Sequence, residues 1–216
     1  MVATMYTAYC LMPEGPEIWA LAEALTASGV PAIAYGKHLL HDKHDIHFGL
    51  NGRAMLTADG HLQHVRTNGI NGRVVPCADL SEMISSNDLG IDWMTASPAA
   101  LQRAISLAYR SRKQLGPWML QQKCIAGVGV AWASEIMHLA GLIPNKPCSE
   151  QNLHHLAEAY VAIRDAVRSL YSEYVSSAAS MKDFVYGWCE NLYSHRDMKV
   201  YKKGTPVLAS GRTYWI

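Results

Sequence analysis

The chain has 216 residues, half of them hydrophobic, which is enough to bury the core of one large or two small domains. The formal net charge is +1, so the total charge indicates no particular partner. The five cysteines form no CxxC pair, which argues against a disulfide framework and against a cysteine-based zinc site. No segment is long and apolar enough to predict a membrane span, and the apolar start lacks the basic residues of a signal peptide.

Charge is distributed unevenly along the chain. The stretch from Trp93 to Ser134 contains no acidic residue, and the stretch from Ser194 to the end contains only Asp197. Two basic blocks on a near-neutral protein favour a one-sided positive surface that holds phosphate backbones, although ordinary solvated surface explains them equally well. The basic residues are Arg103, Arg110, Arg112, Lys113 and Lys123 in the first block and Arg196, Lys199, Lys202, Lys203 and Arg212 in the second.

The first half of the chain predicts a helix followed by short strands. Residues 16–27 have helical apolar spacing that stops at Ser28-Gly29. A short helix is expected at 80–84. The β-type runs between them are 30–35, 36–40, 45–50, 53–57, 61–66 and 74–75, with turns at 59–60 and 67–72.

The second half reads as helical. Ser97 and Pro98 have the residue types of an N-cap and a first helical position, ahead of a helix predicted over 99–109. A basic β-hairpin is expected at the end of the chain, with arms 199–208 and 212–216. Further helices are predicted over 118–122, 131–140 and 150–172, the last with an apolar stripe at Leu153, Leu156, Tyr160, Ile163, Val167 and Leu170.

The stretch Met12-Pro13-Glu14-Gly15-Pro16-Glu17 has the most direct chemical interpretation. A proline at a chain start carries a secondary amine that attacks an aldehyde carbon to form an iminium, and Glu14 could shuttle protons beside it. The alternative is a turn that opens a helix, with Pro16 in the first turn, and this stretch alone favours that alternative. Residues 1–11 precede Met12, and while they remain attached Pro13 is an amide without a nucleophilic lone pair. Either Met12 is the true start, or this leader is trimmed, or the proline chemistry is lost.

Five ordered blocks carry a resemblance to a known family. They are Met12–Ile18, Gly36–Leu40, His47–Gly52, Gln121–Pro144 and Val200–Trp215. Together they resemble the opening, the lysine-bearing strand, the HLGM-type turn, the helix–two-turn–helix segment and the C-terminal finger of the formamidopyrimidine-DNA glycosylase and endonuclease VIII family. The opening is most similar to the endonuclease VIII branch.

The resemblance implies an α+β fold with three parts. A β-rich, sandwich-like catalytic domain is expected at 12–95, with the helix at its start. A helix–two-turn–helix DNA-binding domain is expected at 96–180. A finger hairpin without zinc is expected at 181–216.

The resemblance also implies catalytic roles for three residues. Pro13 would be the nucleophile that attacks the sugar C1′ of a damaged nucleotide, and Glu14 would be the acid/base. Lys37 would contact a phosphate beside the lesion, although on sequence alone a lysine at a strand edge explains it better. Leu50 is at the wedge position that fills the gap left by an extruded base, with Ile70 as a second candidate, and Leu50 could equally be core.

The implied DNA contacts lie in the second half of the chain. Glycines in Ile125–Gly129 would let backbone N–H groups approach a phosphate at a helix N-terminus, or would form a tight interhelical turn, or both. Arg212 would grip phosphates that flank the lesion. The expected DNA-binding residues are Lys123, Gly127, Gly129, Lys202, Lys203 and Arg212.

The chain departs from the family in three ways. Val130 stands where the family has a phosphate-binding asparagine, and valine cannot donate that hydrogen bond. The finger lacks the zinc-binding cysteines, so neither a metal nor another cofactor is expected. Pro13 and Lys37 are separated by 24 positions (37 − 13), fewer than in relatives, so several early strands are missing.

The sequence therefore predicts a bifunctional DNA glycosylase and AP lyase of base excision repair. It would remove oxidised bases, with pyrimidines favoured, from double-stranded DNA and would nick the abasic site. We expect a monomer in the cytoplasm and nucleoid, or in the nucleus of a eukaryote, not secreted and without a membrane partner. The alternatives are an AP lyase without glycosylase activity and a catalytically silent protein that binds damaged or abasic DNA.

Overall fold

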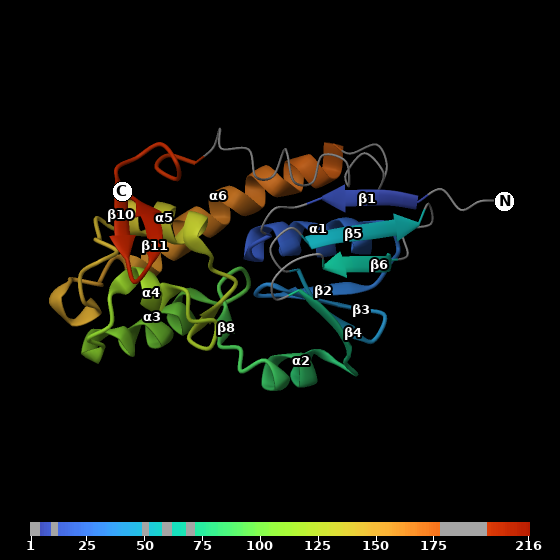
Figure 1. Cartoon of the computed structure of the whole chain (residues 1–216), viewed down its shortest axis with the longest axis horizontal. Helices are drawn as coiled ribbons and strands as arrows, with labels where there is room; N and C mark the ends of the chain where they lie inside the picture. Colours follow the sequence, from blue (N-terminus) through green and yellow to red (C-terminus); the bar gives the residue numbers. More distant parts are fainter. Residues whose placement is uncertain (1–4, 10–12, 49–51, 58–61, 68–71, 178–197) are drawn as a thin grey trace. The chain divides into compact units, whose positions relative to one another are not determined.

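The computed structural model describes residues 5–9, 13–48, 52–57, 62–67, 72–177 and 198–216 (Figure 1). The chain divides into two compact units. Unit 1 comprises residues 1–87 and 168–194, and unit 2 comprises residues 88–167 and 195–216. The three-part division expected from the sequence stays a prediction. In the described part of the chain, no helix has the length and apolar character needed to cross a membrane.

Unit 1 contains a three-stranded antiparallel sheet in which β5 is the central strand. The strands are β1 (Met5–Tyr9), β5 (Gly52–Thr57) and β6 (Leu62–Thr67). Met5 pairs with Thr57 and Tyr9 with Arg53, so β1 runs along the whole of β5. The residues ahead of Pro13, which the sequence identifies only as a leader, thus contribute a strand to the fold.

The second sheet of unit 1 has the order β2-β3-β4-β7 and is also antiparallel. Two-residue turns join its first three strands. Gly36 has φ +60° in the first turn, and Asp42 and Lys43 have φ +46° and +55° in the second, the positive values that tight hairpin turns require. The strands are β2 (Ala32–Tyr35), β3 (His38–His41), β4 (His44–His47) and β7 (Arg73–Pro76).

Helix α1 (Gly15–Ala27) packs against this sheet through contacts with β2 and β3. Side chains alternate across a strand, so Leu39 and Ile46 share one face, and both are buried. Ile18 and Leu25 of α1 are fully buried as well. The helix α2 (Leu80–Ser86) follows β7, and the Asp79 carboxylate accepts the Glu82 N–H at 2.9 Å as its N-cap.

Unit 2 is mainly helical, and its helices largely match the prediction. The Ala100 N–H donates to the Ser97 hydroxyl at 3.2 Å, which confirms Ser97 as an N-cap. A short parallel pair joins β8 (Ile91–Asp92) to β9 (Ile125–Ala126). The helical segments are α3 (Pro98–Ser106), η1 (Ala108–Arg110), α4 (Leu115–Met119), α5 (Val130–Leu139), η2 (Cys148–Glu150) and the part of α6 (Leu156–Ser177) up to Val167.

The long helix α6 differs from the prediction at two points. It begins at Leu156 rather than at residue 150, because the Gln151 side chain both accepts from and donates to the backbone of Ile143 and so holds a loop. In addition, Tyr171 is buried while Leu170 is 39 % exposed. The apolar stripe of α6 therefore ends at Tyr171, one position later than predicted.

The C-terminal hairpin consists of β10 (Pro206–Ala209) and β11 (Arg212–Trp215) and packs on α5 (Figure 1). The Tyr214 side chain is fully buried. Its ring lies so close to Gly116 of α4 that a Cβ at position 116 would be 2.7 Å from a ring atom. The hairpin is thus packed into unit 2 by an aromatic ring that needs a glycine opposite it.

We expect Gly116→Ala to lower the free energy of unfolding by about 1–3 kcal/mol, because the added methyl overpacks a buried ring. The intrinsic helical advantage of alanine, about 1 kcal/mol, works in the opposite direction and is smaller than the cost of displacing a core ring. Urea denaturation measures the difference. Replacing Tyr214 by Leu in the same background should recover part of the loss, and an unchanged midpoint in Gly116→Ala would contradict the packing described.

Candidate active site and nucleic-acid interface

The predicted catalytic pair lies at the start of α1. Pro13 and Glu14 are both buried, and Glu14 is the N-cap residue in an extended conformation. The Glu14 N–H donates to Glu17 Oε2 at 2.8 Å, and the Glu14 carboxylate accepts the N–H of Glu17 in return, which makes a capping box. The structure therefore confirms that this stretch opens a helix, with Pro16 in the first turn, and the catalytic roles of Pro13 and Glu14 stay predictions.

Glu17 connects α1 to α6 within unit 1. The Tyr171 hydroxyl donates to Glu17 Oε1 at 3.0 Å, and the Glu17 side chain is fully buried. Burial, together with the nearby Glu14 carboxylate, raises the pKa of Glu17 to about 7, and the hydrogen bonds from Glu14 and Tyr171 offset only part of this rise. A carboxyl group that still holds a proton near neutral pH thus lies one helical turn from Glu14.

Pro13 follows a segment that belongs to the sheet. Strand β1 ends at Tyr9, and residues 10–12 join it to Pro13 outside the described part of the chain. While this segment is covalently attached, the Pro13 nitrogen is a peptide amide, which has no lone pair available for attack on a carbon. Nucleophilic chemistry at Pro13 needs a free amine there.

Lys37 occupies the two-residue turn between β2 and β3 and is partly exposed. The next residue, His38, is fixed by a buried hydrogen bond of 2.7 Å between its Nδ1 and Asp45 Oδ1. Asn87 Nδ2 donates to Asp45 Oδ2 at 2.9 Å, and Arg73 lies 3.6 Å from the same oxygen. The strand that begins beside Lys37 is therefore held by a polar network.

The Asp45 carboxylate is the centre of that network. Burial alone would raise its pKa, but the hydrogen bond and charge of His38, with the amide of Asn87 and the charge of Arg73, keep the pKa below its ordinary value. The His38 ring lies 4.8 Å from the His47 ring, centroid to centroid. Among the residues that the structure describes, no group of His, Cys, Asp and Glu side chains could hold a metal ion.

The glycine-rich turn before α5 is closed by one side chain. Gln122 Nε2 donates to the carbonyls of Leu120 and Val128, and Gln122 Oε1 accepts the Gly127 N–H at 2.8 Å. Gly127 has φ +95°, a conformation that favours glycine. The Gly127 N–H therefore donates its hydrogen bond within the turn. Gly127 would contribute to DNA binding through the conformation of its backbone. Gly129 is the N-cap of α5, whose first residue is Val130.

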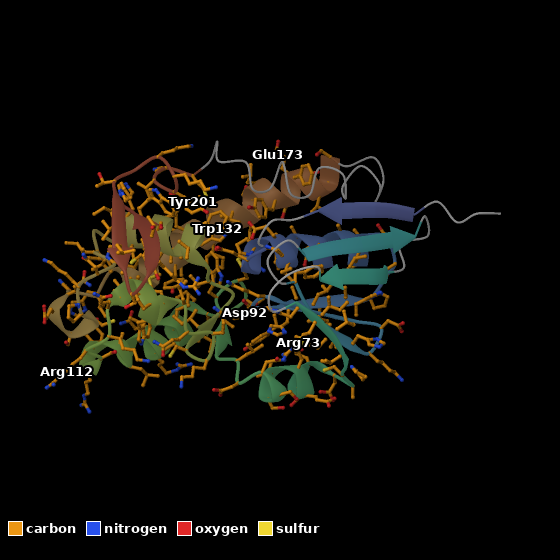
Figure 2. All side chains as sticks on the ribbon, in the orientation of Figure 1. Arg73, Asp92, Arg112, Trp132, Glu173 and Tyr201 are labelled. Atoms are coloured by element: carbon orange, nitrogen blue, oxygen red, sulfur yellow. The ribbon has the colours of Figure 1, made fainter. Side chains whose placement is uncertain are left out.

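The predicted cationic residues differ in whether the structure gives their side chains contacts within the protein. Lys123 and Arg212 are exposed. Lys202 lies with its Nζ 5.4 Å from the centre of the Tyr201 ring, and Lys203 Nζ donates to the Met198 carbonyl at 2.7 Å. Arg112 extends away from the helices of unit 2 (Figure 2). Leu50 and Ile70, the wedge candidates, lie outside the described residues.

Comparison with known proteins finds formamidopyrimidine-DNA glycosylases as relatives. No protein-family model matches the sequence. A formamidopyrimidine-DNA glycosylase of Serratia proteamaculans is 26% identical over 182 residues, covering 77% of this chain and 66% of that protein. The corresponding protein of an Enterobacter species is 26% identical over 226 residues, covering 87% of this chain and 80% of the relative.

Solved structures of formamidopyrimidine-DNA glycosylases from other organisms share the fold. Fpg (MutM) of Lactococcus lactis in complex with DNA that contains N7-benzyl-Fapy-dG has a TM-score of 0.66 at 14% identity, covering 94% of this chain and 97% of the other. MutM (Fpg) of Thermus thermophilus has a TM-score of 0.64 at 18% identity, with 94% and 96% covered. The chain is similar in sequence to formamidopyrimidine-DNA glycosylases and shares the fold of their solved structures. Its predicted α+β fold class is confirmed.

The chain aligns with only part of some of these relatives. It spans 66% of the Serratia protein and 49% of a Cronobacter sakazakii relative. The roles of individual site residues therefore stay predictions.

Sequence reasoning missed several residues that organise the site. Glu17 had a detectable signal, since an acidic residue three positions after an N-cap marks a capping box. Tyr171 had none, because its partner Glu17 is 154 positions away in the sequence. The same holds for Glu135, whose carboxylate binds the backbone at residues 199–201.

We expect the stability of the protein to fall as the pH rises from about 4.5 to about 7. The folded state keeps a proton on Glu17 in this range whereas the unfolded state has lost it, so the stabilisation is complete below the unfolded pKa of 4.5 and is lost as the pH passes the folded pKa of about 7. The shift corresponds to roughly 3 kcal/mol.

Denaturant unfolding between pH 4.5 and 8 measures this effect. Glu17→Gln, which cannot ionise, should flatten this component of the pH dependence. Glu23→Gln, a change at an exposed position of the same helix, should leave it intact. Identical pH profiles for Glu17→Gln and the unaltered chain would rule out the raised pKa.

Proposed function

We propose that this protein is a DNA glycosylase of base excision repair, with AP lyase activity at the resulting abasic site. The buried Glu14 beside Pro13, at the capped start of α1, is the observation that carries this proposal. It has the residue types for Schiff-base chemistry at the position where the family resemblance implies them. The relatives named above are formamidopyrimidine-DNA glycosylases, and 77% and 87% of this chain align with the Serratia and Enterobacter proteins.

In the proposed reaction the Pro13 amine attacks the sugar C1′ of the damaged nucleotide. The bond between C1′ and the base breaks, and the base leaves with a proton taken from solvent. The Glu14 carboxylate takes the proton that the Pro13 nitrogen loses and passes it to the ring oxygen, so the bond between C1′ and the ring oxygen breaks and the iminium forms. The iminium acidifies the neighbouring C2′ proton, and its removal breaks the bond to the 3′ phosphate by β-elimination.

Glu17 supports this chemistry through Glu14. The Glu17 carboxyl accepts the Glu14 N–H and fixes the backbone of the acid/base residue. Because Glu17 keeps a proton near neutral pH, it does not add a second full negative charge beside Glu14 there. Glu17 is thus a positioning residue in the proposal.

Phosphate contacts would come from basic side chains. Lys37 is proposed to hold a phosphate near the lesion from its turn between β2 and β3. Arg212, Lys202 and Lys123 are exposed cations that would bind the DNA backbone. The proposal includes a preference for oxidised pyrimidines as the lesion and for double-stranded DNA as the substrate.

One observation favours a second candidate function. Strand β1 pairs with β5 and precedes Pro13 without a break in the sequence, so the chain as it stands has an amide at the nucleophile position. A protein that keeps β1 attached would bind abasic or damaged DNA without proline-dependent cleavage. An AP lyase that lacks glycosylase activity would be intermediate between the full enzyme and a protein that only binds DNA.

Borohydride trapping on a duplex with an abasic site separates these functions. A chain that begins at Pro13 should form a covalent complex, because reduction fixes the iminium between its amine and C1′. A chain with residues 1–12 attached should form at least about tenfold less complex, since its Pro13 nitrogen is an amide.

The matched control is Pro13→Gly in the chain that begins at residue 13. Glycine keeps a primary amine, so a weakened but detectable complex is expected. If neither form is trapped while both bind the duplex, the enzyme proposal fails and a damage-binding protein remains. Cleavage of an abasic site without release of a damaged base would select the lyase alone.

Arg212→Gln should weaken binding to a duplex that contains a tetrahydrofuran abasic analogue. Loss of one phosphate contact should also lower the slope of log K against log salt concentration by about 0.9. Lys146→Gln removes one positive charge from another exposed position of unit 2 and should change neither quantity appreciably. Fluorescence anisotropy at several salt concentrations measures both, and equal slopes for the two variants would exclude Arg212 as a phosphate contact.

A further inference from the structure

The base of the C-terminal hairpin is held by one acidic side chain. Glu135 of α5 is 4 % exposed, and its carboxylate accepts three consecutive backbone N–H groups. Glu135 Oε2 accepts from Lys199 at 2.9 Å, and Oε1 accepts from Val200 and Tyr201 at 2.8 Å each. Successive backbone N–H groups that converge in this way form an anion-binding nest, and here the anion is a residue of the same unit.

The three hydrogen bonds fix a segment that has little regular structure of its own. Residues 198–204 form a turn in which the Gly204 N–H donates to the Val200 carbonyl at 2.7 Å. Gly204 also lies against the end of the chain, where an added Cβ would be 2.6 Å from the Ile216 carbonyl oxygen. The turn carries the exposed side chains of Lys199 and Lys202 at the surface.

The neighbouring residue Ser134 anchors the other arm of the hairpin. Its hydroxyl accepts the Trp215 N–H at 3.1 Å and donates to the Val130 carbonyl at 2.9 Å. Tyr201 and Trp215, one from each anchored segment, make an edge-to-face contact with ring centroids 4.7 Å apart. Adjacent residues of α5 therefore bind both the turn that leads into the hairpin and its last strand.

We propose that Glu135 is the positioning residue that sets the DNA-binding geometry of the hairpin, in the role that a metal ion has in fingers with zinc ligands. The proposal rests on the proposed function. Gly129 is the N-cap of helix α5, and Glu135 lies six residues further on, about 9 Å along the axis. One rigid helix thus holds the phosphate-binding turn at its start and, through Glu135 and Ser134, the cations of the hairpin.

The geometry explains why a carboxylate can serve here. A carboxylate presents two oxygens with about four lone-pair sites, enough for three donors, and hydrogen bonds to an ionised acceptor are stronger than those between neutral groups. A glutamine at position 135 would offer one acceptor oxygen and would turn an N–H₂ group toward backbone donors. The change keeps the size of the side chain and removes the carboxylate that accepts the three N–H groups.

Hydrogen exchange on the unaltered protein gives the first test. We expect the amide protons of Lys199, Val200 and Tyr201 to exchange at least tenfold more slowly than exposed amides such as that of Ser210, although residues 198–204 form only a turn. Fast exchange at all three amides would overturn the proposal. This measurement involves no DNA, so its outcome does not depend on the proposed function.

Two isosteric variants give the second test. Glu135→Gln should speed exchange at the three amides at least tenfold and should weaken binding to the tetrahydrofuran duplex about tenfold, with a shallower salt slope. Glu150→Gln removes the same charge from an exposed position of unit 2 and should bind at least as tightly as the unaltered protein. Equal affinities and slopes for the two variants would overturn the proposal.

The salt slope separates positioning from a general loss of stability. Partial unfolding reduces the amount of active protein without changing the number of phosphate contacts, so the slope would stay the same. If circular dichroism shows that Glu135→Gln does not fold, Ser134→Ala is the variant that tests the proposal. It should speed exchange at Trp215 and weaken DNA binding two- to fivefold, and unchanged affinity would overturn the proposal. A lack of DNA binding by the unaltered protein would instead refute the proposed function.

Discussion

The candidate catalytic site depends on the burial of one carboxyl group, that of Glu17. Its side chain is fully buried and receives one hydrogen bond from the backbone of Glu14 and one from the hydroxyl of Tyr171. Two donors do not replace the hydration that the group has lost, so protonation supplies the remaining compensation. The start of α1, the backbone of the acid/base residue and the second half of α6 are all tied to this group.

Unit 2 uses a buried carboxylate in a comparable way. Glu135 receives three backbone N–H groups from one turn, whereas Glu17 joins two helices. In both units a buried acidic side chain of a helix binds a partner that lies far away in the sequence, Tyr171 for Glu17 and the backbone of residues 199–201 for Glu135. The expected loss of zinc ligands is consistent with this arrangement, because a hairpin anchored by Glu135, Ser134 and the buried Tyr214 ring has several independent contacts with its helices.

Local sequence rules predicted most of the elements, since caps, glycine turns and helical periodicity act over a few residues. The Ser97 cap, the start of α1 and the C-terminal hairpin are examples. Site residues could be proposed from the sequence only where a motif includes them, as for Pro13, Glu14 and Arg212, and their roles stay predictions. Tyr171 and Glu135 act through partners far along the chain, and no local pattern encodes such pairs.

The residues ahead of Pro13 couple the stability of the sheet to the chemistry of the site. Strand β1 pairs with the whole of β5, and without it β5 would become an exposed edge strand. The same residues, while attached, make the Pro13 nitrogen an amide. A start at Met12 followed by removal of that methionine would free the amine at the cost of the strand. Cleavage of the Met12–Pro13 bond alone would free the amine and leave β1 held by its hydrogen bonds to β5. An intact sheet and a nucleophilic proline are therefore compatible only if the chain is cut between β1 and Pro13.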